Sequence, residues 1–298
     1  MSLKKIVNVA SVPKRSPFRY PGGKTWLVPL ARTWMKHHRG TQSLLVEPFA
    51  GGSIIGLTAA FEGYVDHVLL VEKDPDVAAV WKCIFSSEYM SLCERILAFE
   101  VTETKVRAAL AIETECVEEI AFRTILKNRM FHGGILAPGA SLMKSGENGK
   151  GLKSRWYAKT LADRISAIGR IRDRFTIIEG DGLEALAVNN ENKDAIFFID
   201  PPYTAAGKKA GARLYRFSDL DHSQLFAVAA SLAGDFLMTY DDAHGVRQLA
   251  SDHHFDVELI AMKNTHHAKM KELLIGRDLA WSRIDSRRHQ QFEFNFDG

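Results

Sequence analysis

The feature that most restricts the fold of this chain is an apolar run that ends at two prolines. Residues 195–199 are five consecutive apolar residues, as expected for a buried strand, and Asp200, Pro201, Pro202 and Tyr203 follow directly. Proline has no amide hydrogen to donate to a neighbouring strand, so the strand must end at this carboxylate. Since ligands bind beyond the carboxyl ends of strands in open α/β sheets, this segment is predicted to border a pocket.

The Asp-Pro-Pro-Tyr segment has the groups needed to bind an adenine base. The exocyclic amine of adenine is a poor nucleophile because its lone pair is delocalised into the ring. The Asp200 carboxylate and the Pro201 carbonyl can each accept one amine hydrogen, which favours a more tetrahedral nitrogen. The ring of Tyr203 can stack on the base. A proline-rich turn with a solvated Asp200 is the structural alternative.

A glycine-rich turn earlier in the chain indicates a ligand of the nucleotide type. A predicted strand over 43–47 leads into Glu47-Pro48-Phe49-Ala50-Gly51-Gly52-Ser53, and helical spacing resumes at Ile54. Strand, glycine turn and helix form the first part of a nucleotide-binding unit, although the full dinucleotide spacing is absent. Glu72 follows the next predicted strand, 67–71, where an acid can bind a ribose diol.

Two further segments fit the same ligand. Gly22 and Gly23 allow close approach of the backbone to a ligand, and Lys24 precedes a predicted helix over 26–34. The spacing is not that of a phosphate-binding P-loop. Asp181 ends another predicted strand, where it can contact an adenine amine or cap the next helix.

A block without strand patterns interrupts the alternation of strands and helices. Residues 75–131 show helical spacing throughout, and a loop rich in Gly, Ser and Lys covers 137–154. The chain is therefore predicted to have one catalytic domain, residues 1–85 and 175–298, with a helical insert at 86–174.

Strand and helix patterns continue after residue 217. Asp219 is predicted to cap a helix that runs to Ala233. Strands over 235–240, 255–262 and 272–276 are predicted to complete the sheet.

The net charge of +3 is unevenly distributed along the chain. Residues 123–174 contain twelve basic and three acidic side chains, so the remainder of the chain is acidic. Such a local excess of positive charge favours a polyanionic partner, with scattered charges on a solvated helical face as the alternative.

Other features of the composition exclude several classes of protein. No apolar run approaches the roughly 20 residues of a membrane span, and no secretory signal is recognised, so a cytoplasmic protein without membrane contact is expected. Cys83, Cys93 and Cys116 are expected to be reduced. Neither they nor the paired histidines have zinc-ligand spacing, so no metal is expected.

Taken in their order, these motifs resemble those of the adenine-specific DNA methyltransferases, the class of the bacterial GATC methylases and related phage enzymes. Each motif alone is weak, and four in the family's order are specific. The matching segments are Arg19-Tyr20-Pro21-Gly22-Gly23-Lys24, Glu47-Pro48-Phe49-Ala50-Gly51-Gly52-Ser53, Glu72, Asn128-Arg129-Met130-Phe131, Asp181 and Asp200-Pro201-Pro202-Tyr203.

The resemblance implies an α/β, Rossmann-like S-adenosylmethionine-dependent methyltransferase sheet with an inserted, mainly helical target-recognition domain. It implies methyl transfer to the exocyclic amine of a flipped-out adenine in duplex DNA, with S-adenosylhomocysteine as product and no metal. The implied catalytic residues are Asp200, Pro201, Pro202 and Tyr203. The implied cofactor contacts are Tyr20, Gly22, Gly23, Lys24, Glu47, Phe49, Gly51, Glu72, Asp181 and Asp200.

The resemblance also implies double-stranded DNA as the partner of the insert. The residues expected to contact DNA are Arg129, Lys144, Lys150, Lys153, Arg155, Lys208 and Lys209. The loop from Gly133 to Arg155 lacks the family's GATC-reading hairpin, so no target sequence is assigned. A monomer from a bacterium or phage is expected, and a cognate restriction endonuclease is left open as a further partner.

Three alternatives use the same residues. The chain could methylate RNA adenines, methylate protein side-chain amides, or bind DNA without catalysis on the same fold. The basic insert favours a nucleic acid over a protein substrate but does not separate DNA from RNA.

Overall fold

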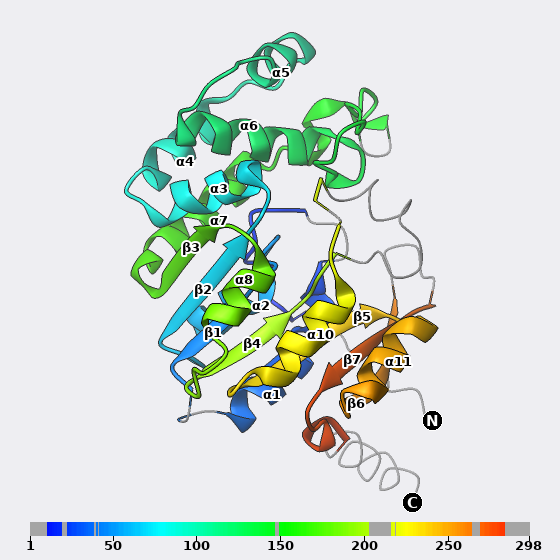
Figure 1. Cartoon of the computed structure of the whole chain (residues 1–298). Coiled ribbons are helices and arrows are strands. Elements are labelled where there is room, and N and C mark those ends of the chain that lie inside the picture. The colour runs from blue at the N-terminus through cyan, green and yellow to red at the C-terminus, as the bar shows by residue number, and fades with distance from the viewer. Residues whose placement is uncertain are drawn as a thin grey trace, which may run out of the picture.

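A seven-stranded sheet runs through the part of the chain that the structure describes (Figure 1). This structure is a computed structural model, and it describes residues 11–19, 23–38, 40, 42–146, 149–202, 216–217, 219–263 and 269–283. The strand order is β3-β2-β1-β4-β5-β7-β6. The strands are β1 (Leu44–Glu47), β2 (His67–Glu72), β3 (Phe175–Glu179), β4 (Ala195–Ile199), β5 (Asp235–Asp241), β6 (Asp256–Lys263) and β7 (Lys269–Gly276).

Strands β1 to β5 are parallel, whereas β7 pairs antiparallel with both β5 and β6. All five residues of β4 are buried, because a parallel strand at the centre of a sheet is covered on both faces. This arrangement confirms the predicted α/β, Rossmann-like sheet.

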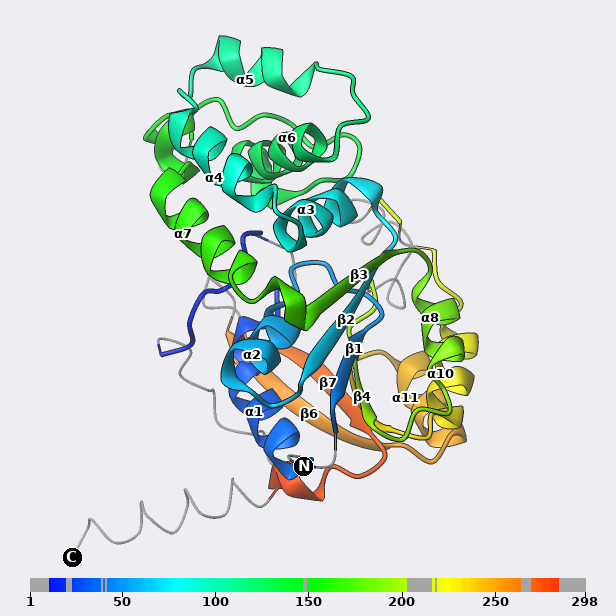
Figure 2. The same cartoon turned by 90° about the vertical axis from the view of Figure 1, so that its left-hand side faces the viewer.

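Helices cover both faces of the sheet (Figure 2). One face carries α1 (Val28–His37), which follows the short helix η1 (Lys24–Leu27), and α2 (Ile54–Glu62). The other face carries α8 (Gly182–Val188), α10 (His222–Ser231) and α11 (His244–Asp252). No described helix is both long enough and apolar enough to span a bilayer.

Aspartates cap several helices that follow the strands. Asp74 accepts a hydrogen bond from the Asp76 amide at 3.0 Å and begins α3 (Pro75–Phe85). The predicted cap at Asp219 is wrong. Asp221 caps α10 instead, because its Oδ1 atom accepts from the Gln224 amide at 2.9 Å.

The predicted helical insert contains α4 (Tyr89–Ala98), α5 (Glu103–Leu110), α6 (Val117–Met130) and α7 (Ala158–Gly169). It lies beyond the carboxyl ends of the parallel strands (Figure 1). Its buried residues, among them Phe122 and Ile165, belong to the same hydrophobic cluster as Leu45 and Val68 of the sheet. The insert is thus packed onto the sheet, and its status as a separate domain stays a prediction.

Candidate active site

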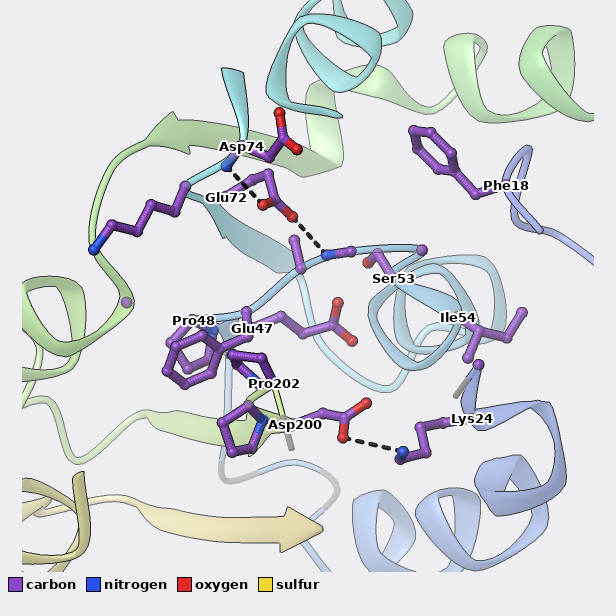
Figure 3. Close-up of a pocket in the computed structure, with 18 of the residues that line it drawn as sticks. Phe18, Lys24, Glu47, Pro48, Ser53, Ile54, Glu72, Asp74, Asp200 and Pro202 are labelled. Carbon is purple, nitrogen blue, oxygen red and sulfur yellow. Dashed lines mark hydrogen bonds and ion pairs between the residues drawn. The ribbon is translucent and has the colours of Figure 1, made fainter. Parts of the chain in front are cut away.

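A cavity of about 440 Å³ lies at the carboxyl ends of β1, β2 and β4 (Figure 3). Its wall includes residues 47–55 after β1, 72–74 after β2 and 200–202 after β4. Small-molecule sites typically occupy about 300 to 1,000 Å³, so the cavity can hold a ligand of that class. It lies where the strand order reverses around β1, the position at which open α/β sheets bind ligands.

Hydrogen bonds from two other elements fix the turn after β1. Gly51 has a φ of 46°, in the left-handed region that favours glycine. Its amide donates to Glu72 Oε2 at 2.9 Å, and its carbonyl accepts from Trp81 Nε1 at 3.0 Å. Both backbone polar groups of Gly51 are therefore used to hold the turn against the cavity.

Glu72 connects the turns after β1 and β2. Its Oε2 atom accepts from Gly51, and its Oε1 atom accepts from the Asp74 amide at 2.9 Å (Figure 3). Burial raises the pKa of Glu72 to about 7, against the lowering effect of these amides. A carboxylate oxygen can accept more than one hydrogen bond, so the predicted contact with a ribose diol is compatible with this position.

Glu47 is a buried acid at the end of β1. Its Oε1 atom accepts from the Gly56 amide at 2.6 Å. Its Oε2 atom and the Ser53 hydroxyl have no hydrogen-bond partner of good geometry, although both are buried. Burial raises the pKa of Glu47 to about 8, and the neighbouring Ser53 hydroxyl and Gly56 amide only partly oppose this. A polar or cationic group of a ligand would satisfy these atoms.

The free protein is expected to lose stability between about pH 5.5 and 8.5. The pKa of Glu47 is about 8 in the folded state against 4.5 ordinarily, so the folded state binds the proton more tightly and stability falls as pH rises through this window. Glu47→Gln should remove part of this loss, on the order of a few kcal/mol. Denaturant unfolding at pH 5.5 and pH 8.5 would measure this loss. An equal loss of unfolding free energy in variant and wild type would contradict the raised pKa of Glu47.

A buried lysine joins two carboxylates at the other side of the cavity. Lys24 Nζ lies 3.1 Å from Asp200 Oδ1 and 3.3 Å from Glu272 Oε2, and its side chain is 3% exposed. Thr239 Oγ1 donates to the same Asp200 Oδ1 atom at 2.7 Å. Burial raises the pKa of Glu272 to about 7, and Lys24 opposes this rise. Glu47, Asp200 and Lys24 extend toward the same space (Figure 3).

The described part of the Asp-Pro-Pro-Tyr segment lies on the cavity wall. Pro201 is buried and Pro202 is half-buried, and both line the cavity with Asp200. Gly23 also lines it. The predicted site residues that lie outside the described residues are Tyr20, Gly22, Tyr203, Lys208 and Lys209.

The turn after β3 packs closely against the glycine-rich turn after β1. A Cβ atom at Gly182 would lie 2.3 Å from the Pro48 carbonyl oxygen, so glycine is required there to bring the start of α8 against Phe49. Asp181 caps α8 through the Leu183 amide at 2.8 Å and pairs with Lys73 at 2.8 Å. Asp181 therefore has the capping role, and it also lines the cavity.

The helical insert holds an N-terminal segment against the cavity. Asn128 Oδ1 accepts from the Arg19 amide at 2.9 Å, and its Nδ2 atom donates to the carbonyls of Arg19 and Gly134 at 3.0 and 2.8 Å. Arg129 donates to the Pro17 carbonyl at 2.5 Å. Phe18 and Arg19 line the cavity, so this motif of α6 shapes the cavity wall.

The basic residues expected to contact DNA are in two kinds of environment. Lys144, Lys150 and Lys153 are exposed, and Arg155 is half-buried. Arg129 is only 4% exposed and bonds to the backbone of Pro17. Arg129 is therefore in the position of a structural residue, and the predicted contact with a DNA phosphate does not fit it.

Comparisons with known proteins leave the function to be argued from the site. No protein-family model and no curated protein matches the chain. One of the solved structures that it resembles is a protein from Pyrococcus horikoshii, provisionally named an RNA methyltransferase. The two share 13% identity with a TM-score of 0.39, over 92% of this chain and 91% of that chain. A likeness of this size supports no inference about activity.

Sequence reasoning missed three residues that contact predicted site residues. Thr239 and Glu272 lie on strands β5 and β7, far along the chain from Lys24, and Trp81 looks like an ordinary apolar residue of a helix. An acid within the apolar strand 272–276 was the one available signal, since a buried carboxylate needs a cation or hydrogen-bond donors.

Proposed function

We propose that this chain is an S-adenosylmethionine-dependent methyltransferase that acts on the exocyclic amine of an adenine flipped out of duplex DNA. The observation that carries the proposal is the position of Asp200. Asp200 follows β4 directly and lines a cavity that Glu47 and Glu72 also line, and two prolines follow it. This places an acceptor for an amine beside acids that suit a cationic nucleoside ligand.

The cavity residues fit S-adenosylmethionine by their chemistry. The unsatisfied Oε2 atom of Glu47 suits the ammonium or the sulfonium charge, and Glu72 suits the ribose diol. Phe49 and Gly182 offer a surface for the adenine ring of the cofactor. The fixed glycine turn at Gly51 leaves no side chain in the way of the ligand.

The chain's own residues then orient the target amine. The Asp200 carboxylate and the Pro201 carbonyl each accept one amine hydrogen, which directs the nitrogen lone pair into the cavity. The two prolines restrict the backbone that carries this carbonyl. S-adenosylmethionine, when bound, would supply an electrophilic methyl group to this nitrogen and would be released as S-adenosylhomocysteine, and the proton lost by the nitrogen would pass to solvent.

Two physical terms make this arrangement effective. Holding two reactants in the right geometry removes much of the entropic barrier to their reaction. A positively charged sulfonium loses its charge during transfer, so a cavity with restricted access to water favours the transition state. Extracting the base from the duplex costs a few kcal/mol, which phosphate contacts can offset.

The choice of a nucleic acid rests on the charge of the insert. Lys144, Lys150 and Lys153 are exposed within the basic segment 123–174 of the insert, and the chain outside that segment is acidic. The choice of DNA over RNA rests on the motif resemblance, and substrate competition tests it directly.

The deciding experiment incubates the purified chain with radiolabelled S-adenosylmethionine and unmethylated genomic DNA, in parallel with structured RNA. We expect label in DNA only, and sequencing of the methylated adenines should give one short motif. Label in RNA alone would move the substrate to RNA. Absence of label together with absence of cofactor binding in calorimetry would support a protein that binds DNA without catalysis.

Replacing Lys144, Lys150 and Lys153 together by Gln is expected to weaken duplex binding and flatten its dependence on salt. Each lost phosphate contact lowers the slope of log K against log salt by about 0.9, so the triple variant should lose up to about 2.7. Fluorescence anisotropy at several salt concentrations measures the slope. Lys193→Gln, an exposed lysine just before β4, is the control and should keep it. An unchanged slope in the triple variant would place the DNA surface elsewhere.

A further inference from the structure

Asp200 is held from two directions by side chains of other elements. Thr239 of β5, 1% exposed, donates its hydroxyl hydrogen to Asp200 Oδ1 at 2.7 Å. Lys24 of η1 approaches the same oxygen at 3.1 Å. The carboxylate therefore has a defined orientation in the folded protein before any ligand binds.

Glu272 in turn positions Lys24. Its Oε2 atom lies 3.3 Å from Lys24 Nζ, and its side chain is 3% exposed. It lies directly opposite Asp241 in the antiparallel pairing of β5 and β7. Because an ammonium can donate three hydrogens, one lysine can bond both carboxylates at once. A flexible lysine side chain thus becomes a fixed donor to Asp200.

We propose that Thr239 and Glu272 are positioning residues of the methyl-transfer site, Thr239 acting directly on Asp200 and Glu272 acting through Lys24. The inference rests on the proposed function. Neither residue needs to touch a substrate. Together they hold the Asp200 carboxylate so that it faces the target amine, and a loose carboxylate would orient the amine poorly.

The hairpin of β6 and β7 gains a catalytic purpose from this arrangement. Lys24 belongs to the N-terminal glycine motif, whereas Glu272 comes from an antiparallel strand near the other end of the chain. Insertion of β7 beside β5 brings the Glu272 carboxylate within 3.3 Å of Lys24 Nζ, the atom that also contacts Asp200 after β4. The hairpin thereby completes the site as well as the sheet.

The test measures the rate of methyl transfer separately from ligand binding. Thr239→Val keeps the side-chain shape but removes the hydroxyl group, and we expect its kcat to fall about tenfold to a hundredfold. Its affinities for S-adenosylhomocysteine and for duplex DNA should stay within about twofold of wild type. Thr239→Ser keeps the hydroxyl group and should restore most of the rate.

Thr58→Val is the matched control. Thr58 is fully buried and donates to the Ile54 carbonyl at 2.7 Å within α2, so this variant also loses a buried hydroxyl group. It should keep the wild-type kcat. A Thr239→Val enzyme with wild-type kcat, or a Thr239→Ser enzyme as slow as Thr239→Val, would overturn the inference.

A second variant tests the path through Lys24. Glu272→Gln should lower kcat several-fold with unchanged binding. If both residues act on one carboxylate, the loss in the Thr239→Val, Glu272→Gln double variant is smaller than the product of the single losses. Fully multiplicative losses would overturn the shared target. A wild-type protein that transfers no methyl group would instead overturn the proposed function itself.

Discussion

Asp200→Asn is expected to lower the rate of methyl transfer by about a thousandfold and to leave duplex affinity nearly unchanged. The carboxylate accepts an amine hydrogen and carries a negative charge, whereas the Asn amide has one neutral acceptor and a group that repels the amine hydrogens. Phosphate contacts elsewhere supply most of the binding energy for DNA. Single-turnover transfer from labelled S-adenosylmethionine measures the rate, and anisotropy measures the affinity.

The matched control for this substitution is Asp194→Asn. Asp194 is an exposed carboxylate that immediately precedes β4, at the end of the strand opposite to Asp200. This variant should keep the wild-type rate, because its side chain is remote from the cavity wall. An Asp200→Asn enzyme with wild-type rate would refute the assigned role of this carboxylate and, with it, the proposed chemistry.

Lys24→Met is expected to lower the free energy of unfolding by about 3 kcal/mol near neutral pH, because it leaves two carboxylates without their shared cation. The difference in unfolding free energy between wild type and Lys24→Met should grow as pH increases. Burial already raises the pKa of Glu272 to about 7, and Lys24 opposes this rise, so its loss raises that pKa further. A folded-state pKa above the ordinary value contributes stability at low pH and loses it as pH increases.

Denaturant unfolding at pH 5.5 and pH 8.5 measures this effect. The double variant Lys24→Met, Glu272→Gln should recover much of the stability, since it removes the buried charge as well as its partner. Its rate of methyl transfer should stay as low as that of Lys24→Met, because Asp200 still lacks its lysine contact. A Lys24→Met protein as stable as wild type at pH 8.5 would show that the ion pairs of Lys24 contribute nothing.

Features that depend on neighbouring residues could be predicted from the sequence. The apolar run before Asp200 is a buried strand that stops at the prolines, because proline cannot continue the ladder of a central strand. The helix Val117–Met130 lies within the block 75–131, whose spacing predicts helices. The cap of α10 shows the limit of such reasoning. Asp219 and Asp221 both suit the N-cap position, and the residue at which the helix begins decides which of them caps it.

Features that join distant segments could not be predicted in this way. The sequence names Asn128 as part of a motif, but its bonds to Arg19 span 109 residues and depend on how α6 packs. Arg129 reads as a surface cation in a basic segment, yet the packing of α6 buries it against Pro17. Charge along a sequence gives no information about which side of a helix meets the core.

The sequence by itself determined, to within one residue, where β1, β2 and β4 end and which acid stands there, because hydrophobic periodicity and chain-breaking residues act over a few positions. Glu47, Glu72 and Asp200 are all placed at strand ends by that local signal. The tertiary structure alone decided that Thr239 and Glu272 meet Asp200 and Lys24. Strand order and antiparallel pairing set those contacts, and both result from the packing of the whole sheet rather than from any local preference.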